Sequence, residues 1–68
     1  MSRLYEVDLF VKGDVNELDH FVGTVQLKSI TQVAKFLDTV DFSYINTVVY
    51  TPKNNYLNAQ DILKIWRS

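Results

Sequence analysis

The chain has 68 residues, no cysteine and a net charge of −1, which allows one small domain, residues 1–68, and excludes several protein classes. Without cysteine there is no disulfide and no thiolate for catalysis or metal binding, and this composition fits a reducing compartment. No apolar run approaches the roughly 18 residues of a membrane span, and no signal-type segment precedes the first strand. We therefore expect a soluble cytoplasmic protein, complete as it stands.

Residues 4–12 alternate in character, as a half-buried strand does. Their odd positions are all apolar: Tyr5, Val7, Leu9 and Val11. Because successive side chains of a strand point to opposite faces, these residues predict a core face. The other face carries Leu4, Glu6, Asp8 and Phe10.

A second strand is expected over residues 21–28, joined to the first as an antiparallel hairpin by a loop around residues 15–19. In this prediction Phe21, Val25 and Leu27 share one face. Gly23 falls on the same apolar face, which indicates a bulge or the close approach of a large neighbour.

The first helix begins after Ser29, which forms a Ser-x-x-Gln capping box with Gln32. Helical spacing then predicts about three turns with one apolar stripe. The stripe comprises Ile30, Val33, Ala34, Leu37 and Val40, with Phe36 at its edge.

Residues 44–51 are rich in β-branched and aromatic side chains and predict a third strand, but their two faces are equally apolar and leave the facing open. Pro52–Asn55 has the composition of a turn. Asn58 then caps a second helix, with Leu57 and Ile62 in the positions of a hydrophobic staple. The predicted buried stripe of this helix is Ala59, Ile62, Leu63 and Trp66, with Ile65 on its flank.

The predicted fold is therefore a small α+β domain with the order ββαβα. A three-stranded, mainly antiparallel sheet has its first strand in the centre and both helices packed on one face. The opposite face stays open to solvent.

Catalysis is the weakest functional hypothesis. His20 beside Asp19 is the only candidate for a general base and its orienting partner, but adjacent strand residues point to opposite faces and no nucleophile is placed near them. One histidine without cysteine argues against a transition-metal site, and the acids around Asp14 lack the ligand order of a calcium loop. With only two glycines there is no phosphate-binding loop. We expect no catalytic residue, metal or cofactor.

The leading prediction is a small non-enzymatic protein-binding module, accessory or regulatory, acting through the open face or an edge of its sheet. On that face Leu4 and Phe10 form an apolar pair ringed by Glu6 and Asp8, as in an interface core with a polar rim. The third strand carries no charge from residue 44 to residue 51, so we expect its edge to be covered by the second helix or by a second chain in a homodimer.

Two other kinds of partner remain open at this point. Nine aromatic residues allow base stacking, with Lys53, Lys64 and Arg67 as phosphate contacts, although Glu6 and Asp8 oppose this hypothesis. Alternatively, an acidic surface mimics nucleic acid in the basic groove of a partner protein. Its residues are Glu6, Asp8, Asp14, Glu17 and Asp19.

Overall fold

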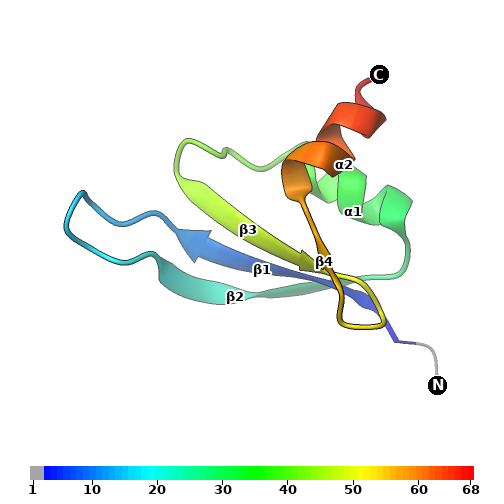
Figure 1. The fold of residues 1–68 in the computed structure, drawn as a ribbon, viewed down its shortest axis with the longest axis horizontal. Coiled ribbons are helices and arrows are strands. Elements are labelled where there is room, and N and C mark those ends of the chain that lie inside the picture. Colours follow the sequence, from blue (N-terminus) through cyan, green and yellow to red (C-terminus); the bar gives the residue numbers. More distant parts are fainter. Residues whose placement is uncertain (1–2) are drawn as a thin grey trace.

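A computed structural model describes residues 3–68 as an antiparallel sheet with two helices on one of its faces (Figure 1). The elements are β1 (Tyr5–Val11), β2 (His20–Leu27), α1 (Ile30–Leu37), β3 (Ile45–Tyr50), β4 (Tyr56–Leu57) and α2 (Ala59–Trp66). The strand order is β2-β1-β3-β4. The predicted α+β class and the central position of β1 are confirmed, and the two-residue β4 is an additional strand.

The core lies between the helices and the odd positions of the sheet. Its buried members are Val7, Val33, Ala34, Leu37, Val49 and Leu63. Val7 pairs with Val49 across β1 and β3, and this register settles the facing of β3: its odd residues point toward the helices. The even residues Asn46, Val48 and Tyr50 therefore share the opposite face with the even residues of β1.

Both helices begin at the predicted caps. The Ser29 hydroxyl accepts a hydrogen bond from the Gln32 N–H at 3.2 Å, while the Gln32 side chain accepts from the Lys28 N–H at 2.9 Å, one residue before the cap. The Asn58 side chain accepts from the N–H groups of the first turn of α2. In the turn before β4, Asn54 has a φ of 65°, a conformation that asparagine tolerates better than most residues. Helix α1 ends at Leu37, about a turn earlier than predicted.

A bulge interrupts the β1–β2 hairpin. Leu9 pairs with Gly23, but the next β1 residue, Phe10, pairs with Phe21, so Val22 has no partner on β1. The predicted bulge is therefore confirmed. It also reverses the facing of the strand before it, because one extra residue shifts the alternation. The prediction that Phe21 shares a face with Val25 was wrong, and Phe21 instead joins Phe10 on the helix-free face.

The last turn of α2 is less buried than predicted. Leu63 is buried, but Trp66 is 40% exposed and Ile65 is 76% exposed. The C-terminal end of α2 points away from the sheet (Figure 1), so only its earlier turns pack on the strands. Trp66 and Ile65 instead border an apolar groove between the helices, together with Ile30 and Ile62.

The helices cover only one end of the sheet. The β1–β2 hairpin extends beyond them (Figure 1), and the Cα radius of gyration of 12.3 Å exceeds the roughly 11 Å expected for this length. We call Val11 together with His20–Gly23 the projecting end. Val11 and Val22 are 41% and 61% exposed there, and a Cβ atom added to Gly23 would meet no atom within 4 Å.

Candidate binding face

The open face is the helix-free side of the sheet, and the strand register arranges its side chains in three rows. The first row has Gln26, Glu6, Tyr50 and Tyr56; the second has Thr24, Asp8 and Val48; the third has Phe21, Phe10 and Asn46. Each row crosses the sheet from β2 toward β3 or β4. Residues far apart in the sequence are thereby brought onto one surface.

Two aromatic pairs lie at opposite ends of this surface. Phe10 and Phe21 meet edge to face, with ring centroids 5.5 Å apart, and Tyr50 lies against Tyr56 with centroids 5.1 Å apart. Phe21 is 59% exposed and Tyr56 is 73% exposed. Such rings carry large apolar area into a contact and lose little conformational entropy.

The charged strand residues of the open face are both acidic, Glu6 and Asp8. Asp8 accepts a hydrogen bond from the Thr24 hydroxyl at 2.7 Å, and Glu6 lies opposite Tyr50 in the β1–β3 register. The side chain of Tyr56 raises the pKa of Tyr50, and desolvation and the carboxylates of Asp8 and Glu6 add to the shift. None of the four strands contains lysine or arginine. A cation supplied by a partner would therefore meet no positive strand residue on this face.

The β1–β2 loop contributes further residues to the open face. A shallow hollow there has Phe10, Leu18 and Val48 as apolar lining, and Glu17 and Asp19 as acidic lining. An aliphatic stem with a cationic head, as in lysine or arginine, has the matching chemistry.

Asp19 holds this loop in place. Its carboxylate accepts hydrogen bonds from the Asn46 side-chain amide and from the Gly13 N–H. The Asn46 bond is the main cause of a lowered Asp19 pKa, followed by the Gly13 bond and the nearby Lys12. Asp19 is therefore ionised at neutral pH.

The four predicted partner-binding residues are distributed as the alternation of β1 requires. Glu6, Asp8 and Phe10 lie on the open face, and Leu4 is half-buried just before β1, where it borders a depression with Arg3 and Glu6. Sequence reasoning missed two aromatic members, Phe21 and Tyr56, and left the facing of a third, Tyr50, open. The bulge hid Phe21, the equal faces of β3 hid Tyr50, and the two-residue length of β4 hid Tyr56.

The three predicted phosphate contacts are not brought together. Arg67 forms an ion pair with Asp38, with Nη2 2.7 Å from Oδ1, and Lys64 is exposed on α2. The turn that contains Lys53 lies at the opposite end of the molecule from the C-terminus (Figure 1). All three cations lie outside the four strands.

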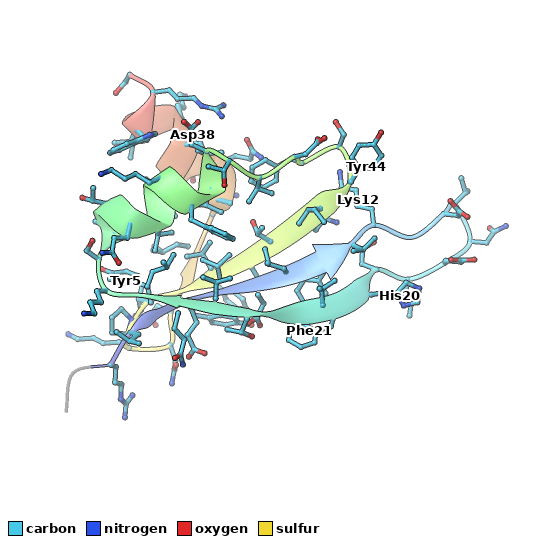
Figure 2. All side chains as sticks on the ribbon, turned by 180° about the vertical axis from the view of Figure 1, so that it is seen from behind. Tyr5, Lys12, His20, Phe21, Asp38 and Tyr44 are labelled. Atoms are coloured by element: carbon cyan, nitrogen blue, oxygen red, sulfur yellow. The ribbon has the colours of Figure 1, made fainter. Side chains whose placement is uncertain are left out.

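His20 lies exposed at the projecting end, near Phe21 (Figure 2). Its neighbour Asp19 directs its carboxylate to Asn46 and Gly13. Within residues 3–68 no group of three or more His, Cys, Asp or Glu side chains is arranged to hold a metal ion. In the same part of the chain, every helix is too short or too polar to cross a membrane.

Comparisons with protein-family models, with curated proteins and with solved structures find no match to this chain.

Proposed function

We propose that the protein is a non-enzymatic binding module whose open face docks a protein surface with cationic groups between two apolar patches. One observation carries the proposal: the open face combines two exposed aromatic pairs with the Glu6 and Asp8 carboxylates, and its strands supply no lysine or arginine. The predicted site around Glu6, Asp8 and Phe10 is thereby extended across the whole sheet.

The two kinds of side chain have different roles in such a contact. Aromatic residues buried in an interface supply much of its affinity, so the Phe10–Phe21 pair is the expected anchor. The Glu6 and Asp8 carboxylates, on the central strand between the two aromatic pairs, steer the encounter and select the partner. Lysine or arginine of the partner gains both from the carboxylates and from cation–π contact with exposed rings such as that of Tyr56.

The same electrostatics disfavours nucleic acid. Phosphate binding depends on clustered basic residues and on the release of counterions from the polymer. On the open face, stacking of a base on Phe21 or Tyr56 would bring phosphates toward Glu6 and Asp8. A protein partner with basic groups reverses the sign of that interaction.

The test is affinity capture from a nuclease-treated lysate of the source organism, with wild-type protein and two matched variants. Phe21→Glu places a charge at the anchor without touching the buried core, whereas Val15→Glu changes a loop residue that is fully exposed. We expect one protein partner to be retained by the wild type and by Val15→Glu, and to be lost with Phe21→Glu. Increasing salt should weaken its binding.

Circular dichroism of each variant checks that the fold is intact. Capture of the same partner by Phe21→Glu would overturn the proposal. So would a parallel capture without nuclease that recovers nucleic acid and no protein partner. Glu6→Lys provides a second test, on the acidic residues of the face. It should slow association with the captured partner and reduce the salt dependence, while dissociation changes little.

A further inference from the structure

The outer edge of β2 has no partner strand among the described residues, although this strand runs for eight residues, from His20 to Leu27. We infer that it is a self-association edge, where β2 pairs antiparallel with β2 of a second copy of this chain. The product is a dimer with one continuous sheet made of two four-stranded halves. This inference is independent of the proposed function.

The direction of the backbone groups follows from one hydrogen bond. The Lys12 N–H donates to the Tyr44 carbonyl at 2.9 Å, so the even positions of β1 bond toward β3 and its odd positions bond toward β2. Val7 pairs with Val25, and therefore Val25 also bonds inward, to β1. The N–H and C=O groups of Thr24 and Gln26 point outward.

The opposite edge of the sheet is already partly covered. There β4 pairs with Val49 and Tyr50 of β3, and the chain then turns into α2. The sequence predicted that the second helix or a second chain would cover the β3 edge. Part of this edge is instead covered by β4, a strand of the same chain. A homodimer through the third strand would have only the first part of β3 to use.

The composition of β2 suits pairing with its own copy. Between His20 and Leu27 there is no Asp, Glu, Lys, Arg or Pro, so two copies bring no like charges together. Monomeric proteins usually protect such an edge with lysine, proline or a bulge. Here only the bulge at Val22 is present, which leaves Gly23–Leu27 regular. With Val25 on a two-fold axis, Thr24 of each copy exchanges backbone hydrogen bonds with Gln26 of the other.

The shape of the molecule is self-complementary about the same axis. The helices cover the Leu27 end of β2 and leave the projecting end bare. A two-fold rotation reverses these ends, and so α1 of the second copy comes beside the bare end of the first. At that bare end Val22 is 61% exposed and the position of Gly23 is open, which leaves room for the helix of the second copy.

The test is sedimentation equilibrium from micromolar to millimolar concentration, on the wild type and two proline variants. Gln26→Pro removes an outward N–H from β2, a position where an edge strand tolerates proline. Thr47→Pro is the matched control, because Thr47 points its N–H toward the outer side of β3, beyond the reach of β4. We expect wild type and Thr47→Pro to dimerise, and Gln26→Pro to remain a folded monomer by circular dichroism.

Amide hydrogen exchange gives a second readout that needs no variant. In the dimer the Thr24 and Gln26 amides should be protected, and dilution should expose both while the Val25 amide stays protected. A wild-type protein that is monomeric at millimolar concentration would overturn the inference. A dimer that persists in Gln26→Pro, or is lost in Thr47→Pro, would do the same by placing the contact elsewhere.

Discussion

Gly13 and Gly23 are the only glycines, and their surroundings differ in a way that substitution reveals. A Cβ atom at Gly13 would lie 2.7 Å from the backbone oxygens of Glu17 and Leu18, while at Gly23 it would meet nothing within 4 Å. We expect Gly13→Ala to destabilise the protein by about 1–3 kcal/mol, as overpacking does. Gly23→Ala should change the free energy of unfolding by no more than about 0.5 kcal/mol.

Urea unfolding followed by circular dichroism measures both glycine variants. Equal stability of Gly13→Ala and the wild type would show that the β1–β2 loop relaxes around the added methyl group.

Thr47 within β3 and Thr51 just after it should respond to the same substitution with opposite signs. The Thr47 hydroxyl is buried and lacks a hydrogen-bond partner among the described residues, whereas the Thr51 hydroxyl accepts from the N–H groups of Lys53 and Asn55. We expect Thr47→Val to stabilise the protein by about 1 kcal/mol, since an unsatisfied buried hydroxyl is removed. Thr51→Val should destabilise it by about the same amount, because two turn amides lose their acceptor.

Thermal unfolding of the two threonine variants in parallel is the measurement. A lower melting temperature for Thr47→Val than for the wild type would contradict the assignment of that hydroxyl as unsatisfied.

Residue types alone indicated part of the candidate face. Glu6, Asp8 and Phe10 were predictable because the alternation of β1 is clear. Phe21 was not, because a bulge changes facing without changing composition, and the sequence signal at Gly23 gave the bulge but not its side. The contact between Tyr50 and Tyr56 was not predictable either, because it forms only when β3 and β4 pair.

At the scale of elements, the Asp19–Asn46 hydrogen bond joins the β1–β2 loop to β3. It lowers the Asp19 pKa below its ordinary value of 3.8, so without this hydrogen bond Asp19 would bind a proton at a higher pH. The stabilisation is therefore present above pH 3.8 and is lost as the pH falls through the lowered value. Asn46→Ala should raise the Asp19 pKa toward 3.8.

An NMR titration of the Asp19 carboxyl carbon measures this effect. Asn55→Ala, in the turn after β3, serves as the control and should leave the Asp19 titration unchanged. A titration that is also unchanged in Asn46→Ala would mean that the Gly13 N–H, the other hydrogen-bond donor, sustains the shift alone.

Most elements were predictable because their signals are local. Ser29 and Asn58 cap the two helices through bonds to their own first turns. The strand that covers the outer edge of β3 was not predictable, because β4 is two residues long and exists only by pairing with β3. The facing of β3 likewise depends on Val7, a residue that is distant in the sequence and supplies its partner.

At the scale of the whole molecule, stability depends on a very small core. Leu37 is fully buried between α1 and the sheet, while Leu18 in the β1–β2 loop is 88% exposed. Leu37→Ala should cost about 2–5 kcal/mol, which is comparable to the roughly 3–5 kcal/mol that a core of this size supplies. We therefore expect Leu37→Ala to be largely unfolded at room temperature.

Leu18→Ala is the matched control and should unfold at the same urea concentration as the wild type, within about 0.5 kcal/mol. A cooperative, near-wild-type transition for Leu37→Ala would show that the core repacks around the cavity.

The global arrangement was largely predictable from the sequence, since a central first strand and one-sided helices follow from the element order and from chain connectivity. The exposure of Trp66 was not. Helical spacing places it on the same stripe as Leu63, but the tilt of α2 away from the sheet depends on how the two helices pack.

The central position of β1 has a consequence for synthesis of the chain. β1 is synthesised before its two neighbours and can pair at once with β2, which follows closely in the sequence. Its second neighbour, β3, and the helix residue Leu63 that seals the core are made later. During that interval a nascent hairpin would expose Val7 and Leu9 to solvent on one face and leave one edge of β1 unpaired. Half-made chains are therefore the form of this protein that a chaperone would be expected to bind.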